Sequence, residues 1–134
     1  MNLRGVYLTL RECIPMLKEA GAEHGKALMV NTASYAGKHG QGWLAAYSAT
    51  KFGVVGLSQA LHKELSRDGV QVTALCPGFV ETPMTDWVEA VPSEAMIQPE
   101  DLAEATRFLL KTSPNCVVPE IQFIRPGDVP GSGV

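Results

Sequence analysis

The chain has 134 residues, the usual size of one domain, and 46% of them are hydrophobic while 19% are charged. This composition can fill a core and excludes general disorder. The net charge of −3, from 11 Lys and Arg against 14 Asp and Glu, argues against a nucleic-acid partner, which needs clustered basic residues.

The sequence also gives no sign of a membrane or a metal. No apolar stretch approaches the roughly 18 residues that a spanning helix needs, and the amino-terminal MNLRGVYLTLREC carries charges where a signal peptide would be apolar. Cys13, Cys76 and Cys116 are odd in number and far apart, without a CxxC pair or histidines at ligand spacing. We therefore expect no membrane partner, no bound metal and a cytoplasmic location.

The first expected elements are a helix over residues 2–20 and a buried strand over 26–33. The apolar residues of the helix are three or four apart on one face: Leu3, Tyr7, Leu10, Ile14 and Leu17. Gly21 is predicted to end this helix. Because Met1 and Asn2 leave almost no room for a cap, we expect the chain to begin inside a helix. The strand is short and wholly apolar at its centre, which is typical of a parallel strand buried on both faces.

A glycine-rich connection at residues 37–42 leads into a second expected helix, over residues 45–66. An apolar stripe runs along it: Val54, Leu57, Leu61 and Leu65. Small residues form a second strip: Ala49, Gly53, Gly56 and Ala60. A glycine inside a helix costs about 1 kcal/mol relative to alanine. The strip therefore predicts close packing, either on the protein's own sheet or against another subunit.

The remaining elements follow from caps and short apolar runs. A strand is expected over residues 70–76 and a short helix from Thr82-Pro83 to about Val91. A longer helix is expected from Pro99 to Lys111, and a last strand over 121–124.

The order of these elements alternates helices with strands. This is the pattern of a Rossmann-like, doubly wound parallel α/β sheet. Residues 125–134 contain turn residues and little to bury, so we expect an exposed, flexible tail.

The strongest chemical signal is the pair Tyr47 and Lys51 in the sequence YSATK. Residues four apart share one face of a helix, so the two polar groups can meet over one site. A phenol with its usual pKa near 10 is a poor base at neutral pH, but an ammonium about 4 Å away stabilises the phenolate by roughly 4 kcal/mol at an effective dielectric near 20. Tyr-x-x-x-Lys also occurs by chance in many helices, so the pair needs support from its surroundings.

That support comes from the ends of the two predicted strands before and after the pair. Ser34 follows the first strand, and Pro77-Gly78 with Thr82 follows the second. The carboxyl ends of parallel strands meet at one edge of a sheet, where ligands bind in such folds. We therefore expect Ser34, Tyr47 and Thr82 to face one crevice.

Together these residues resemble the short-chain dehydrogenase/reductase family. The resemblance is carried by Asn31-Thr-Ala-Ser34, by Tyr47-Ser-Ala-Thr-Lys51-Phe-Gly-Val and by Pro77-Gly78 with Thr82, in the family's order and approximate spacing. Asn2 in MNLRGVY also resembles the asparagine of the family's helix ahead of the catalytic strand. The resemblance covers nearly the whole chain, and its combination of motifs is highly specific.

The resemblance implies an NAD- or NADP-dependent oxidoreductase that interconverts an alcohol and a carbonyl. Tyr47 would exchange the hydroxyl proton, Ser34 would orient the substrate oxygen, and Asn2 would hold a water in the proton relay. Lys51, beside Tyr47, would bind the nicotinamide ribose, and Thr82 with the backbone after Pro77-Gly78 would meet the carboxamide. The cofactor would supply the hydride.

The family's phosphate-binding TGxxxGxG turn, its NNAG segment and the residue that selects NAD or NADP do not occur in this sequence. Gly37, Gly40 and Gly42 have a different spacing and position. We therefore expect residues 1–134 to represent a partial domain, the carboxyl-terminal half of the family fold, with an unprotected sheet edge.

Two functions remain open from the sequence. The chain is either part of an active oxidoreductase, or a truncated, non-catalytic fragment that keeps the oligomerisation helices. For the oxidoreductase we favour a small free alcohol or ketone as substrate over an acyl group on an acidic carrier protein, because residues 68–106 contain no Lys or Arg to attract such a partner. In the resembled family the helices corresponding to 2–20 and 45–66 pair across a two-fold axis, which implies a homo-oligomer. His39, Trp43 and Trp87 are further candidates for the substrate side, with ordinary loop or packing roles as the alternative.

Overall fold

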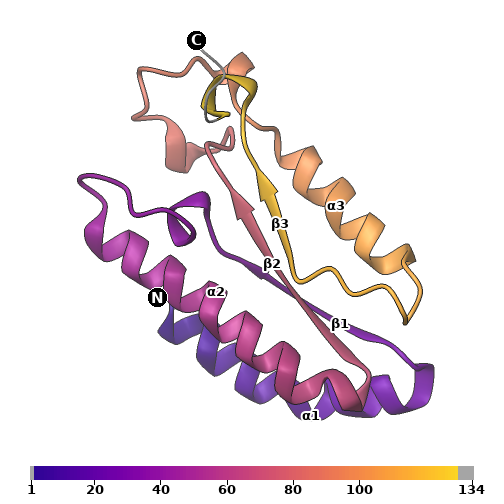
Figure 1. Cartoon of the computed structure of the whole chain (residues 1–134). Coiled ribbons are helices and arrows are strands. Elements are labelled where there is room, and N and C mark those ends of the chain that lie inside the picture. The colour runs from indigo at the N-terminus through magenta and orange to yellow at the C-terminus, as the bar shows by residue number, and fades with distance from the viewer. Residues whose placement is uncertain (1, 130–134) are drawn as a thin grey trace.

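The computed structural model describes residues 2–129 and contains a three-stranded parallel sheet (Figure 1). Its strands are β1 (Ala27–Thr32), β2 (Val70–Pro77) and β3 (Glu120–Phe123), in the spatial order β1-β2-β3. Both pairings are parallel, so their carboxyl ends lie at the same edge of the sheet. The predicted parallel α/β fold class is confirmed.

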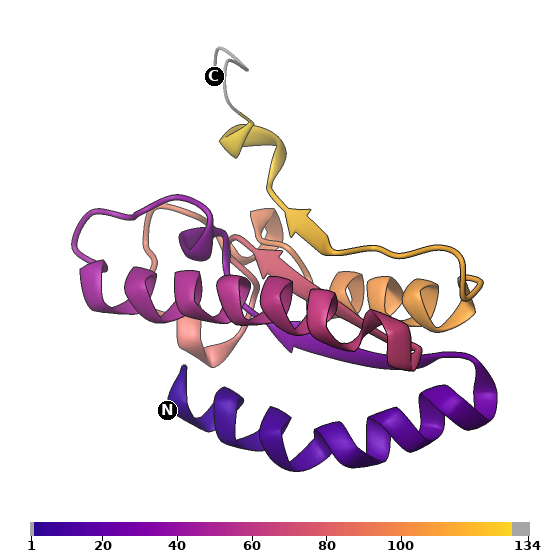
Figure 2. The ribbon, with the colours of Figure 1, turned by 60° about the horizontal axis from the view of Figure 1, so that its bottom comes forward.

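Helices α1 (Arg4–His24) and α2 (Ala45–Leu65) run side by side with their amino ends toward the same end of the molecule (Figure 2). They share one core cluster with the sheet residues beneath them: Leu10, Ala27, Met29, Leu61, Leu65, Val70 and Val72. A second cluster lies closer to the carboxyl ends of the strands: Ala33, Val54, Val55, Ala74 and Cys76. The predicted apolar stripe of α2 therefore forms the main cover of the sheet.

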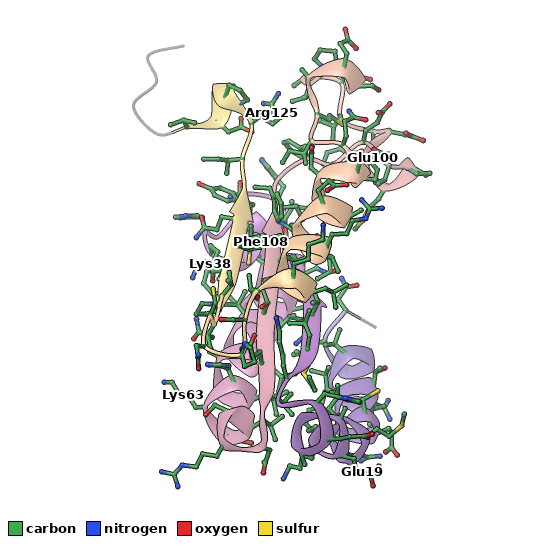
Figure 3. The ribbon with its side chains drawn as sticks, turned by 90° about the vertical axis from the view of Figure 1, so that its right-hand side faces the viewer. Glu19, Lys38, Lys63, Glu100, Phe108 and Arg125 are labelled. Carbon is green, nitrogen blue, oxygen red and sulfur yellow. The ribbon has the colours of Figure 1, made fainter. Side chains whose placement is uncertain are left out.

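Helix α3 (Pro99–Lys111) covers the opposite face of the sheet (Figures 1 and 3). Leu109 is its buried anchor. The Nζ of Lys26, at the start of β1, donates to the carbonyl oxygens of Leu109 and Thr112 at 2.6 Å each and to Thr112 Oγ1 at 2.9 Å. Lys26 thus satisfies carbonyl groups that the end of a helix leaves without partners.

The two longer strands differ in burial. Every residue of β2 is buried, whereas β1 alternates between buried and more exposed residues, contrary to the expectation of burial on both faces. The reason is position: within residues 2–129, β1 pairs only with β2. A groove of about 570 Å³ lies along α1 and β1, lined by residues that include Leu10, Leu17 and Met29.

The predicted end of the first helix is wrong. Helix α1 continues past Gly21 to His24, and Gly25 ends it with φ +74 and an N–H donated to Gly21 O at 2.9 Å. Gly21 is buried, and a Cβ there would overlap the carbonyl oxygen of Asp68. Its small size therefore serves a close approach between α1 and the turn before β2.

The short helix predicted from Thr82 to Val91 does not form. The structure has only a 3₁₀ turn at Pro83–Thr85 and another at Ser93–Ala95. Met84 and Trp87 remain exposed and only Val91 of the segment is buried, so no continuous apolar face supports a helix here. A bridge from Val80 to Ile97 closes it as a loop beyond the carboxyl end of β2.

The expected tail at 125–134 begins with a 3₁₀ turn, and its flexibility stays a prediction. Arg125 donates twice to the carboxylate of Asp128 at 2.8 Å, around a 3₁₀ turn at Pro126–Asp128. Residues 130–134 of the predicted tail lie outside the described residues.

Candidate active site

Ser34 lies two residues beyond β1, at the carboxyl edge of the sheet. It begins the 3₁₀ turn η1 (Tyr35–Gly37), in which its Oγ accepts a hydrogen bond from Ala36 N at 3.1 Å. The same hydroxyl lies 3.5 Å from the carbonyl oxygen of Pro77. Ser34 is half-buried, so part of the residue remains accessible.

Tyr47 and Lys51 lie on adjacent turns of α2, as their spacing predicts. The Lys51 Nζ is 5.6 Å from the centre of the Tyr47 ring and donates to Thr32 O at 3.4 Å. Thr32 is the last residue of β1, so Lys51 reaches the strand that leads to Ser34. Desolvation by burial lowers the pKa of Lys51 from its ordinary value. The structure therefore gathers Ser34, Tyr47 and Lys51 around one strand end.

A buried hydrogen bond fixes α2 against β1 next to this group. Asn31 Nδ2 donates to Ser58 Oγ at 2.9 Å, and that hydroxyl donates to Val54 O at 2.8 Å. Asn31 and Ser58 are both buried. Asn31 belongs to a motif that the sequence shows, whereas the role of Ser58 was not predictable, because a serine inside a helix has no distinctive spacing.

The segment after β2 starts beside Ser34, whose hydroxyl contacts Pro77 O. That Thr82 faces one crevice with Ser34 and Tyr47 stays a prediction. Gly78 N donates to Phe123 O at 2.8 Å, which holds the turn against the end of β3. Thr82 N donates to Thr85 Oγ1 at 3.2 Å, and the Thr85 hydroxyl donates to Val80 O at 2.7 Å. Thr82 is half-buried, with its own Oγ1 making only a 3.5 Å contact to Val80 O.

Asn2 precedes α1 and is exposed. The next residue, Leu3, packs over Gly53 of α2, where a Cβ would come within 2.9 Å of the Leu3 side chain. The amino end of α1 is therefore held on α2, on the side of the molecule where α2 also begins (Figure 2). The water-holding role of Asn2 stays a prediction.

Two loop residues between Ser34 and Tyr47 are notable: His39 for a ring contact and Trp43 for its backbone conformation. His39 stacks on Tyr35, with ring centroids 4.7 Å apart. Trp43 is fully exposed and has φ +66, which no other non-glycine residue in the described chain adopts. The sequence does not predict this backbone conformation, because tryptophan rarely adopts it.

A parallel sheet with helices on both faces and polar side chains at the carboxyl ends of its strands is a Rossmann-like α/β fold (Figure 1). The family model of the short chain dehydrogenases matches residues 1–91, and the chain belongs to this family. The predicted family is confirmed. None of the described helices is long and apolar enough to cross a membrane. Residues 2–129 contain no cluster of ligands that could hold a metal ion.

Similarity to known proteins points the same way. A protein of Streptomyces coelicolor that bears the name of a ketoacyl reductase is 39% identical over 130 residues, 81% of this chain and 49% of that protein. The structure of 3-ketoacyl-(acyl-carrier-protein) reductase from Brucella melitensis, complexed with NADH, matches with a TM-score of 0.79 and 36% identity over 90% of this chain and 52% of that one.

A third match is the F189W actinorhodin polyketide ketoreductase with NADPH, with a TM-score of 0.74 and 34% identity over 94% of this chain and 56% of that one. The chain thus spans about half the length of the proteins that it matches. Both structural neighbours hold a nicotinamide cofactor.

Proposed function

We propose that this chain provides the proton-transfer side of an NAD- or NADP-dependent oxidoreductase that interconverts a small alcohol and a carbonyl compound. The observation that carries the proposal is the gathering of Ser34, Tyr47 and Lys51 at one strand end, with the Lys51 ammonium 5.6 Å from the Tyr47 ring. In this proposal Tyr47 is the general acid and base, and Ser34 donates a hydrogen bond to the substrate oxygen.

Lys51 places its ammonium 5.6 Å from the centre of the Tyr47 ring, where its positive charge would assist the proton transfer. Because burial lowers the pKa of Lys51, its charge is lost at a less alkaline pH than that of an exposed lysine. The proposed activity therefore declines as the pH rises through this lowered pKa. Asn2 would hold a water that returns the proton to solvent.

The residues present fit the nicotinamide end of the cofactor. Lys51 offers ammonium hydrogens and Tyr47 a hydroxyl to the ribose, while Pro77, Gly78 and Thr82 lie in a fixed turn beside the same edge. When bound, the nicotinamide supplies or accepts the hydride.

The first test is cofactor binding by the chain, followed by fluorescence of NADH and NADPH. Micromolar binding that weakens in a Lys51→Met variant supports the proposal. Binding of neither cofactor, by a folded chain, favours the alternative of a non-catalytic fragment that retains its oligomerisation helices. The three free cysteines support a reducing, cytoplasmic setting for either case.

The second test is turnover of a simple ketone, followed by the absorbance of the reduced cofactor. Tyr47→Phe is expected to lower kcat about 100-fold or more, because it removes the proton donor. Tyr7→Phe is the matched control, since it removes the same hydroxyl from an exposed position on α1. Full turnover by Tyr47→Phe would exclude the catalytic assignment.

A further inference from the structure

Hydrogen bonds fix Ser34 to the turn η1, which follows it directly. Ser34 has an extended backbone at the start of η1, its Oγ accepts from Ala36 N at 3.1 Å, and its carbonyl oxygen accepts from Gly37 N at 2.8 Å. Any movement of η1 therefore moves the Ser34 hydroxyl with it.

One side of η1 is held by α2. Gly37 is buried, and a Cβ at this position would come within 2.7 Å of the Lys51 carbonyl oxygen. Only glycine leaves room for this approach. The turn is thereby set at the level of Lys51, one helical turn from Tyr47.

The other side of η1 is held by an ion pair with β3. Lys38, directly after the turn, places Nζ 3.0 Å from Glu120 Oε1, and the two side chains are only 27% and 21% exposed. Figure 3 shows Lys38 beside β3. The pair joins two segments that are distant in sequence, and it is the least exposed lysine–carboxylate pair among residues 2–129.

Lys38 helps to keep the partly buried Glu120 carboxylate ionised. Burial alone would raise the pKa of Glu120, but hydrogen bonds from Gln122 and Lys38 and the Lys38 charge lower it. Cys76 lies next to the pair. Its pKa is raised to about 11, first by burial and then by the Glu120 charge, while Lys38 and a hydrogen bond from the Ser34 backbone oppose the rise. Removing either partner would leave the other charge partly buried without compensation.

We propose that Lys38 and Glu120 are positioning residues that hold η1, and with it Ser34, between α2 and β3. Neither residue touches the substrate; both act through the turn. This inference rests on the proposed function for its catalytic meaning, but the positioning itself is measurable without turnover.

The first experiment uses the buried Cys76 thiol as a probe of η1, in a chain where the exposed Cys13 and Cys116 are replaced by serine. Lys38→Met removes a positive charge near Cys76 and leaves the negative charge of Glu120, which disfavours the Cys76 thiolate. Because the thiolate is the form that reacts with a disulfide reagent, this electrostatic effect alone would slow the reaction. Release of η1 would instead expose the thiol. We expect a roughly tenfold faster reaction.

Two further variants complete this experiment. The charge-reversed double variant Lys38→Glu with Glu120→Lys should return the rate to within about threefold of the parent, because it restores the pair in the opposite sense. Glu104→Gln is the control, since it breaks an exposed ion pair on α3. A Lys38→Met rate that is unchanged or slower, in a folded protein, would overturn the proposal.

The second experiment measures kinetics with a nicotinamide cofactor. Lys38→Met and Glu120→Gln are each expected to lower kcat about tenfold while leaving the KM for the cofactor within about twofold, since Ser34 contacts the substrate oxygen and not the cofactor. An equal rise in the cofactor KM would point to general loosening and would overturn the specific role. Failure of the proposed function would appear as full turnover by Tyr47→Phe, whereas the thiol experiment decides the positioning without any turnover.

Discussion

Trp43 has a backbone conformation with positive φ, which tryptophan rarely adopts. It is the third residue of a turn closed by Leu44 N donating to Gln41 O at 3.2 Å, and this position with positive φ favours glycine. The indole is fully exposed and so gains little burial in return. Strain of this kind is often kept at functional sites, and Trp43 lies four residues before Tyr47.

This strain leads to a stability prediction. Trp43→Gly should unfold at a higher urea concentration than Trp43→Ala, with a difference in unfolding free energy of roughly 1 kcal/mol. Both variants remove the exposed side chain, so their difference isolates the backbone conformation. Equal stability of the two, or greater stability of the alanine variant, would show that the φ of residue 43 carries no strain.

Single residues were predictable to different degrees. Ser34, Tyr47 and Lys51 could be predicted to converge because strand ends and helical spacing bring them together by geometry alone. Lys38 and Glu120 could not, since neither belongs to a local pattern and their contact depends on how β3 is placed. The same is true of Ser58, whose partner Asn31 lies on another element.

At the scale of elements, the packing of α1 against the turn before β2 depends on glycine. Gly21 lies against the backbone of Asp68 and Gly69, and Gly69 has φ +76. Neither position has room for a Cβ, so the helix and the turn approach backbone to backbone.

This approach predicts opposite effects for two glycines of the same helix. Gly21→Ala should lower the free energy of unfolding by about 1–3 kcal/mol, because the added methyl forces α1 away from the turn. Gly5→Ala should leave it unchanged or raise it by up to about 1 kcal/mol, because a Cβ there meets nothing within 4 Å. Thermal or urea unfolding measures both, and a neutral Gly21→Ala would contradict the close approach.

Elements were predictable where an apolar pattern and a boundary signal agreed. The strands, α2 and α3 meet this condition, and their observed bounds differ from the predicted ones by about a residue. The end of α1 was misplaced because glycine can mark either a helix end or a tight contact. The segment 82–91 had the caps of a helix but no apolar stripe, and its turns close on nearby threonines instead.

At the scale of the whole molecule, the strip of small residues on α2 is largely uncovered. Ala49, Gly56 and Ala60 are exposed, while Gly53 lies under Leu3. The predicted homo-oligomer through this helix therefore stays a prediction, with Gly56 as its cleanest probe because no atom lies within 4 Å of a Cβ there.

If α2 pairs with a second copy, the chain should sediment with a mass above its 14.4 kDa, and Gly56→Leu should return it to that mass. Ala103→Leu is the matched control, since it enlarges an exposed small residue on α3. Sedimentation of the unaltered chain at 14.4 kDa across micromolar concentrations would contradict the oligomer.

The difference in burial between β1 and β2 bears on how the candidate site is kept together. Ser34 follows β1, which has one strand neighbour in the described chain. Helix α2, which carries Tyr47, packs against the fully buried β2. Local opening of β1 would separate the two hydroxyls and would take Ala27 and Met29 out of the core cluster that they share with α1 and α2. Binding at the edge of β1 that has no strand partner in the described chain is therefore thermodynamically linked to assembly of the candidate site. A molecule that binds this edge raises the fraction of chains in which the site is assembled.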